Sequence, residues 1–276
     1  MLQDIAPHRF KNEYCPRSCK PQDRVLVFSE DRLLCAMEGG VIELPTAAQL
    51  GISAGQYAFT LDDAAFFLWE GAPLEERSPW RYIPCKSLRD VGPAHLRFAA
   101  AVGKSLARWY HTNRYCGVCG AAMAKSETER ALVCPKCGQT VYPKIAPAVI
   151  VAVTDGDRLL LTKYAGRAFT RYALVAGFAE IGETIEQTVH REVAEETGLA
   201  VKNLRFYRSQ PWVYTDSLLF GFWAELDGSD EIRRQESELS EAAWFARDAL
   251  PSDHSEISLT GEMIELFRAG GERSVP

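Results

Sequence analysis

Four of the eight cysteines form two close pairs, CGVC at Cys116 and Cys119 and CPKC at Cys134 and Cys137. Two such Cys-x2-Cys knuckles, separated here by fourteen residues, can bring four thiolates together around one Zn²⁺. Since protein ligands would fill all four positions, this zinc is expected to be structural and not catalytic. A nucleic-acid-binding ribbon is the alternative interpretation, but so short an insert favours scaffolding.

A second group of chemically active side chains lies in the segment REVAEETG, which starts at Arg191. Glu192 and Glu196 are one helical turn apart, and Glu195 lies three residues after Glu192. Like charges at these spacings repel each other by roughly 0.2–0.5 kcal/mol per pair on an exposed helix. Taken alone, the segment would be a solvated helix face on which Arg191 pairs with Glu195.

The elements that must position these groups can be placed from sequence patterns. The cysteine pairs follow a helix that is predicted over 93–110. The glutamates lie on a predicted helix with a capping box of Thr184 and Gln187 at its start and Gly198 at its end. Short apolar runs broken by Gly, Pro and charge indicate a β-rich N-terminal region. After the cysteine pairs, alternating strand-like and helix-like segments indicate an α/β domain.

The segment around the glutamates resembles the signature of the Nudix hydrolases, G-x5-E-x7-R-E-U-x-E-E-x-G-U with U apolar. The nine matching positions are Gly177, Glu183, Arg191, Glu192, Val193, Glu195, Glu196, Gly198 and Leu199. The resemblance implies that Glu192 and Glu196 bind Mg²⁺ or Mn²⁺, with Glu195 in the same cluster and the carbonyl of Ala176 as an added ligand. Such cations would remove the repulsion between the carboxylates. The resemblance also implies a catalytic set, in which the arginine orients a glutamate: Glu183, Arg191, Glu195 and Glu196.

A second motif, SQPWVYTDS, resembles the SQPWPFPxS array of the NADH pyrophosphatase branch of this family. Val213, Tyr214 and Thr215 replace its Pro, Phe and Pro. The likeness continues in YCGVCG, CPKCG, VYPKIAP, LVAGFAE and ESELSEAAWF. It implies substrate contacts from the array and from four residues outside it: Gln210, Pro211, Trp212, Val213, Tyr214, Thr215, Asp216 and Ser217, then Arg89, Tyr142, Phe178 and Thr260.

Two residue roles follow from the same motifs. By their place in these motifs, Tyr142 and Phe178 resemble the aromatic residues that sandwich the nicotinamide ring in this branch. Flat rings bind well between aromatic faces. Glu238 resembles a further metal-binding glutamate outside the signature, with Glu236 and Glu241 as alternatives.

The implied fold class is α/β. A Nudix α/β/α sandwich with a mixed sheet is expected over 143–276. It should be preceded by a small β-rich domain over 1–111 and a four-cysteine zinc ribbon over 112–142.

Composition limits the cellular context. With 276 residues and 47% hydrophobic content, the chain can bury a sizeable core. The first residues lack a signal-peptide core, and the longest apolar run, 145–153, is too short to span a bilayer. Since the cysteine spacing does not suggest a disulfide framework, we expect a cytoplasmic protein.

Charge is unevenly distributed along the chain. Residues 97–171 hold 12 Lys/Arg and 4 Asp/Glu, a surplus of +8, although the whole chain carries −6. This surplus favours an anionic ligand or partner near the segment, and a basic solvated surface is an equally good interpretation.

The resemblance implies metal-dependent hydrolysis of the diphosphate of NAD(H) to AMP and nicotinamide mononucleotide. It also implies removal of NAD caps from RNA 5′ ends, and a homodimer. Hydrolysis of ADP-ribose or dinucleoside polyphosphates is the alternative within the family, but it needs neither the array nor the cysteine insert. An alternative of another class is a zinc-ribbon nucleic-acid-binding regulator with a non-catalytic Nudix domain, and the complete signature argues against it.

Overall fold

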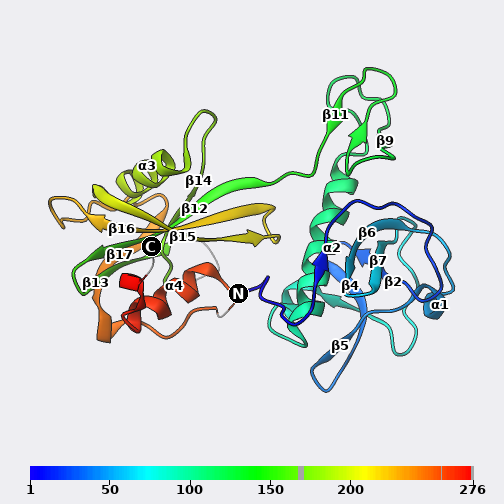
Figure 1. The fold of residues 1–276 in the computed structure, drawn as a ribbon, viewed down its shortest axis with the longest axis horizontal. Helices are drawn as coiled ribbons and strands as arrows, with labels where there is room; N and C mark the ends of the chain where they lie inside the picture. The colour runs from blue at the N-terminus through cyan, green and yellow to red at the C-terminus, as the bar shows by residue number, and fades with distance from the viewer. Residues whose placement is uncertain (167–170, 256, 275–276) are drawn as a thin grey trace. The chain divides into compact units, whose positions relative to one another are not determined.

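The computed structural model describes residues 1–166, 171–255 and 257–274. The chain forms two units, which Figure 1 shows as ribbons. The C-terminal unit comprises Met1–Leu2, Ile145–Trp212 and Asp216–Pro276, and the N-terminal unit comprises Gln3–Lys144 and Val213–Thr215. The expected domain limits at residues 111 and 142 stay predictions.

A six-stranded mixed sheet forms the centre of the C-terminal unit. Its order is β15-β16-β12-β13-β17, and β14 pairs with β12. β12 and β16 run parallel, and the other neighbouring strands are antiparallel. The mixed sheet that the resemblance implies is therefore confirmed. The strands are β12 (Ala146–Asp155), β13 (Arg158–Tyr164), β14 (Val175–Phe178), β15 (Val201–Trp212), β16 (Ser217–Leu226) and β17 (Leu239–Ala246).

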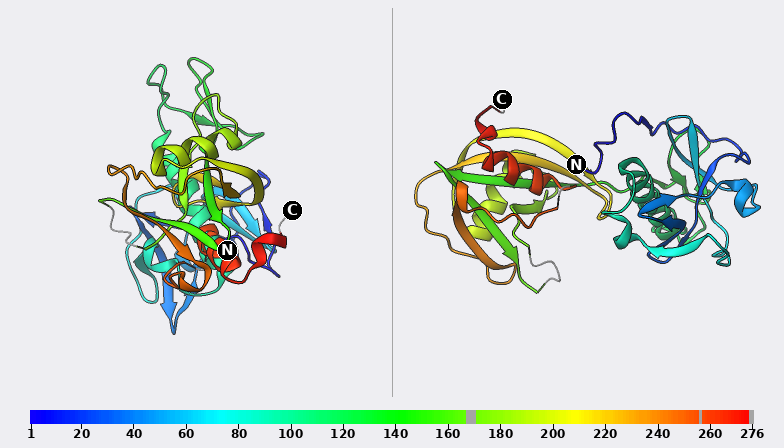
Figure 2. Two further views of the ribbon diagram at one scale, coloured as in Figure 1. Left: turned by 90° about the vertical axis from the view of Figure 1, so that its left-hand side faces the viewer. Right: turned by 90° about the horizontal axis from the view of Figure 1, so that it is seen from below.

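Side-chain alternation along β12 gives the sheet two buried faces. Val149 and Val151 belong to a core that includes Val189 of the helix α3. Ile150 points to the opposite face, where the core includes Met263 of the helix α4. The sheet is therefore the middle layer of an α/β/α sandwich, as Figures 1 and 2 show. The helical elements of this unit are α3 (Ile185–Thr197), α4 (Leu259–Arg268) and the short 3-10 turns η2 (Arg247–Ala249) and η3 (Gly271–Ser274).

The N-terminal unit is rich in short strands, as the sequence predicts. One sheet has the order β1-β6-β7-β2, and a second has the order β3-β4-β5 with β8 paired to β4. Their bounds are β1 (Phe10–Lys11), β2 (Arg24–Leu26), β3 (Phe28–Ser29), β4 (Arg32–Glu38), β5 (Val41–Glu43), β6 (Gln56–Leu61), β7 (Ala64–Leu68) and β8 (Arg81–Pro84). The unit also contains the short helix α1 (Ala47–Leu50) and the 3-10 turn η1 (Cys85–Leu88).

The long helix α2 (Ala94–Thr112) packs on these strands and confirms the helix predicted over 93–110. A Cβ at Gly103 would lie 2.2 Å from a methyl carbon of Leu26, so glycine permits this close approach of helix and strand. Beyond the end of α2, a three-stranded sheet carries the cysteine insert: β9 (Ala124–Lys125), β10 (Leu132–Val133) and β11 (Thr140–Val141). None of the helices in the described part of the chain is long and apolar enough to cross a membrane.

Candidate active site

The glutamate helix α3 begins and ends where its sequence predicts. The Thr184 hydroxyl accepts a hydrogen bond from the Gln187 backbone N–H at 3.2 Å. The Gln187 side chain accepts one from the Thr184 N–H at 2.8 Å, which completes a capping box. Gly198 ends the helix in the left-handed conformation with φ 72°, where a side chain would be strained. Local sequence therefore fixes both ends of the helix that carries the carboxylates.

Arg191 is the centre of the acidic cluster. Its Nε donates to Glu183 at 2.6 Å, and its Nη1 donates to Glu192 at 2.8 Å and to Glu195 at 2.9 Å. Nη2 donates to the backbone carbonyl of Phe178 at 2.9 Å and again to Glu183. The pairing with Glu195 that a solvated helix face would have is present. It is one of several contacts through which one guanidinium holds three carboxylates and the end of β14.

Two glutamates of the cluster are buried. Glu192 is 8% exposed and Glu196 is 2% exposed, whereas the side chain of Glu195 is 54% exposed. Burial raises the pKa of Glu192, against the opposing effect of Arg191. Buried carboxylates need a compensating positive charge, and a bound cation is one way to supply it.

The backbone of β14 lies directly against the Glu192 carboxylate. A Cβ at Gly177 would lie 1.9 Å from the carboxyl carbon of Glu192 and 2.1 Å from one of its oxygens. Only glycine leaves this space. Ala176, whose carbonyl is a predicted ligand, precedes Gly177 in the same strand. The first glycine of the signature therefore allows backbone and carboxylate to meet.

Glu183 anchors the loop before α3. Hydrogen bonds from Arg191 and from the Glu180 backbone N–H lower the pKa of Glu183 to about 2. The hydroxyl of Thr188 also donates to it, at 3.0 Å. Glu183 is therefore ionised throughout the neutral range, and it fixes Arg191 through two hydrogen bonds.

The three candidates for an additional metal-binding glutamate differ in their surroundings. The charge of Glu238 is close enough to contribute to the raised pKa of Glu192. Glu241 instead accepts a hydrogen bond from Lys163 at 2.9 Å and another from Tyr172. Glu236 pairs with Arg234 at 3.5 Å. These contacts favour Glu238, whose role stays a prediction.

The donor set of this cluster fits a hard divalent cation. Carboxylate and carbonyl oxygens are the ligands that Mg²⁺ and Mn²⁺ prefer, and no thiol takes part. The acidic cluster is looser than the cysteine cluster. Among the described residues, only the four cysteines bring three or more possible ligand atoms within 4.8 Å of one another.

The four cysteines of the insert have the geometry of a tetrahedral thiolate site. The Sγ atoms of Cys116 and Cys137 lie 3.6 Å apart, and those of Cys119 and Cys134 lie 3.5 Å apart. Four sulfurs at the usual Zn–S distance would be about 3.8 Å apart. Backbone N–H groups, chiefly that of Cys137, lower the pKa of Cys134 to about 6, which favours the thiolate that binds metal.

The predicted substrate array divides between the two units. Pro211 and Trp212 end β15 and Ser217 begins β16, while Val213–Thr215 belong to the N-terminal unit. There the guanidinium of Arg89 lies 4.1 Å from the centroid of the Tyr214 ring. The array thus joins the units along the chain, and Arg89 and Tyr214, which were predicted from separate motifs, are in contact.

The contacts of Gln210 indicate a structural role. Its side chain is fully buried, its carbonyl accepts from the Leu259 N–H at 2.7 Å, and its amide donates to the Ile257 carbonyl at 2.8 Å. It therefore positions the start of α4. Thr260, another predicted substrate residue, lies in the first turn of that helix.

The two aromatic residues predicted to contact nicotinamide are both exposed. Tyr142 is 56% exposed and Phe178 is 54% exposed. Tyr142 belongs to the N-terminal unit and Phe178 to β14 of the C-terminal unit, and the sandwich stays a prediction. The Tyr142 hydroxyl donates to Glu129 at 3.0 Å.

Comparison with known proteins agrees with this geometry. A NUDIX domain model matches residues 144–267, and the model of the NADH pyrophosphatase zinc ribbon domain matches residues 111–142. The NAD-capped RNA hydrolase NudC of Pectobacterium atrosepticum is 42% identical over 188 residues, which cover 66% of this chain and 71% of that protein. The chain belongs to the Nudix hydrolase family. Its zinc ribbon places it in the NADH pyrophosphatase branch.

Two other proteins are similar to this chain. NudC of Chromobacterium violaceum, also an NAD-capped RNA hydrolase, is 45% identical over 166 residues, 60% of this chain and 62% of that protein. A crystal structure of a Nudix hydrolase from Nitrosomonas europaea has a TM-score of 0.52 at 21% identity and covers 59% of this chain and 94% of that one. That likeness supports the Nudix fold alone.

Glu129, which accepts the hydrogen bond of the Tyr142 hydroxyl, was not predicted from the sequence of this Nudix hydrolase. Glu129 lies in no recognisable motif, and only the fold of the ribbon brings it to Tyr142, thirteen residues later. The acid-rich composition of the ribbon loop, SETER, was the only available signal.

Proposed function

We propose that this Nudix hydrolase cleaves the diphosphate bond of NAD(H), releasing AMP and nicotinamide mononucleotide, and that it removes NAD caps from RNA 5′ ends. The observation that carries the proposal is the complete glutamate cluster around Arg191, in a chain that also has an NADH pyrophosphatase zinc ribbon. The NudC relatives bear the name NAD-capped RNA hydrolase, which supports the same bond as the target.

We further propose that Glu192, Glu196 and the carbonyl of Ala176 hold Mg²⁺ or Mn²⁺, with Glu195 and Glu238 beside them. The burial of Glu192 and its approach to the β14 backbone support this arrangement. Bound there, a divalent cation would neutralise the diphosphate and activate water for attack on phosphorus. Zn²⁺ would stay in the ribbon, because the ribbon offers four thiolates and no open position.

The side chains of the protein would act mainly by positioning. Arg191 is fixed by Glu183 and in turn holds Glu192 and Glu195, so the carboxylates are oriented before substrate binds. Phe178 and Tyr142 each offer an exposed aromatic face for the nicotinamide ring. Arg89 and Tyr214 would contact the substrate, as would other residues of the array from Pro211 to Ser217 and Thr260.

We also propose a homodimer and a cytoplasmic location. Large apolar side chains on the surface, such as Ile145 at 66% exposed, support a protein interface. The four cysteines outside the ribbon are free thiols, which suits a reducing compartment. Light scattering at several protein concentrations would measure the oligomeric state.

The site assignment is tested with Glu196→Gln. Because this variant removes a charge from the metal cluster and keeps the shape of the side chain, we expect NADH hydrolysis to fall by a factor of about 10²–10⁴, the range of a lost electrostatic or acid–base group. Zinc content and melting temperature should not change. Glu186→Gln is the matched control, since Glu186 is an exposed glutamate in the first turn of the same helix. Hydrolysis by Glu196→Gln at the rate of Glu186→Gln would refute the assignment.

A further inference from the structure

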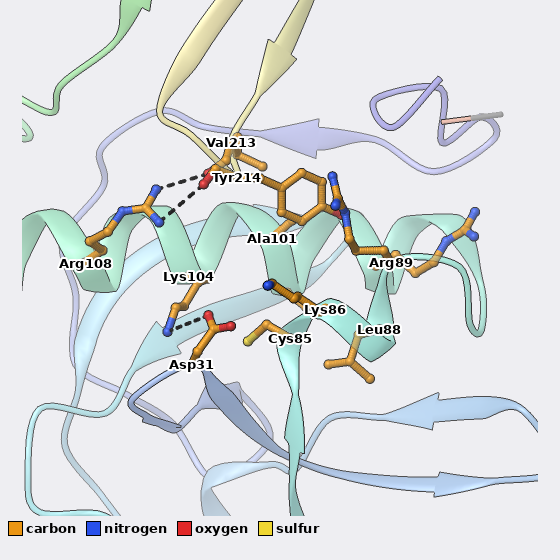
Figure 3. A pocket seen from close by; sticks show the side chains of 12 residues that line it. Asp31, Cys85, Lys86, Leu88, Arg89, Ala101, Lys104, Arg108, Val213 and Tyr214 are labelled. Atoms are coloured by element: carbon orange, nitrogen blue, oxygen red, sulfur yellow. Dashed lines mark hydrogen bonds and ion pairs between the residues drawn. The ribbon is translucent and has the colours of Figure 1, made fainter. Parts of the chain in front are cut away.

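The N-terminal unit contains two adjoining pockets whose charge is opposite to that of the whole chain. The smaller one, about 140 Å³ in volume, lies between η1 and α2, and Val213 and Tyr214 also line it (Figure 3). The larger one, about 640 Å³, extends from α2 to the zinc ribbon. Lys104 and Arg108 of α2 line both pockets. The two are therefore neighbours along one helix.

Cationic side chains surround the smaller pocket. Five of its lining residues are basic and only Asp31 is acidic: Lys86, Arg89, Arg97, Lys104 and Arg108. Lys104 pairs with Asp31 at 3.4 Å, so the one acidic side chain of the pocket already has a basic partner. The Nε of Arg97 is buried without a hydrogen-bond partner among the described residues. The pocket thus has a surplus of donors and positive charge for its size.

The larger pocket combines positive charge with aromatic rings. Its aromatic residues are Phe28, Trp69, Tyr110 and Tyr115, and Tyr115 is 68% exposed. Its own basic residues are Arg114 and Lys125, and Lys125 pairs with Glu70. Taken together, the two pockets are lined by seven Lys/Arg against three Asp/Glu, a net charge of +4 in a chain that carries −6.

We propose that these two pockets form a binding groove for single-stranded RNA, with backbone phosphates in the smaller pocket and bases on the aromatic rings of the larger one. Proteins bind single strands through this combination of a basic groove with aromatic faces on which bases stack. A free nucleotide would need only one of the two pockets. An acidic peptide would not need four aromatic rings.

The inference rests on the proposed function, because the RNA in question is the chain that follows the NAD cap. Tyr214 and Arg89, which line the smaller pocket, are predicted substrate residues of the array. The groove therefore begins at residues that are expected to contact the cap. Five of the basic residues of 97–171 line the groove: Arg97, Lys104, Arg108, Arg114 and Lys125.

The test uses the full-length holoenzyme and a variant with one cation removed from each pocket, Lys86→Gln with Arg114→Gln. Both side chains are exposed, and neither belongs to the predicted catalytic or cap-binding set. Fluorescence anisotropy measures binding of an uncapped, unstructured RNA 20-mer. We expect weaker binding, and a log–log salt dependence that is less steep by about 1.4, since each phosphate contact on a single strand contributes about 0.7. NADH hydrolysis should remain within twofold of the original rate.

Arg9→Gln with Lys11→Gln is the matched control, because both residues are exposed, lie in the same unit and line neither pocket. A third variant, Tyr115→Ala, should weaken RNA binding about fivefold or more without changing the salt slope, and Tyr115→Phe should restore it, as stacking requires. Equal RNA binding by the pocket variant and the control variant overturns the groove. If the unmodified protein did not hydrolyse NADH, the proposed function would be contradicted instead. Failure of the groove and failure of the proposed function can therefore be told apart.

Discussion

Among single residues, Arg191 and Gly177 both affect where the carboxylates lie. Arg191 has a planar fork of donors and uses it on three glutamates at once. Gly177 contributes by lacking a side chain, because the space that a Cβ would fill is taken by the Glu192 carboxylate. Signature residues that are not predicted to bind metal thus help to set the geometry of those that are.

We predict that Gly177→Ala disables the site while the chain stays folded. The new methyl group would displace the Glu192 carboxylate, and a displacement of about 1 Å can cost about 100-fold in rate. NADH hydrolysis and Mn²⁺ affinity, measured side by side, should both fall. Gly117→Ala is the control, since nothing lies within 4 Å of the added atom there. An active Gly177→Ala variant with normal Mn²⁺ affinity would contradict this role of Gly177.

Among the elements, α4 depends on a residue that was predicted to bind substrate. Gln210 of β15 is hydrogen bonded to the Leu259 N–H and the Ile257 carbonyl at the start of this helix. We predict that Gln210→Leu lowers the free energy of unfolding by about 1–3 kcal/mol for each buried group left without a partner. Urea unfolding measures the loss, with the exposed Gln139→Leu as control. Unchanged stability with impaired NADH binding would indicate a direct substrate contact instead.

The zinc ribbon is a second element whose role in stability can be tested by mutation. In such a site the free energy of metal binding contributes to folding. We predict that Cys134→Ser loses zinc and lowers the melting temperature, because one of four converging thiolates is removed. Zinc content from atomic absorption and a thermal melt measure both effects, and Cys15→Ser is the control, since Cys15 is an exposed cysteine outside the ribbon. A zinc-free variant with the original melting temperature would contradict a structural role.

Elements with local signals were predictable from the sequence, and long-range contacts were not. The capping box of Thr184 and Gln187 is only four residues long, so pattern alone located the start of α3. The contact of Gln210 with Leu259 spans 49 residues and depends on how β15 and α4 pack, which no local pattern encodes. Glu129 was missed for the same reason.

For the whole molecule, the sequence predicted a basic middle segment but not where its charges meet. The pockets collect Asp31, Lys86, the basic residues of α2 and Tyr214, which come from distant parts of the sequence. That Val213–Thr215 belong to the N-terminal unit was equally unpredictable, because the residues on either side of them belong to strands of the other unit. Folding therefore converts a diffuse charge surplus into a defined surface.

The central claim is that the whole protein breaks the diphosphate bond of NAD(H) and no other bond. The most direct measurement is mass spectrometry of the products formed from NADH in ¹⁸O-labelled water with Mg²⁺ or Mn²⁺ present, with Glu196→Gln as the inactive control. We predict equal amounts of AMP and reduced nicotinamide mononucleotide, with a single ¹⁸O atom on one of the two phosphates. Release of nicotinamide with ADP-ribose, or label-free products, would contradict the account.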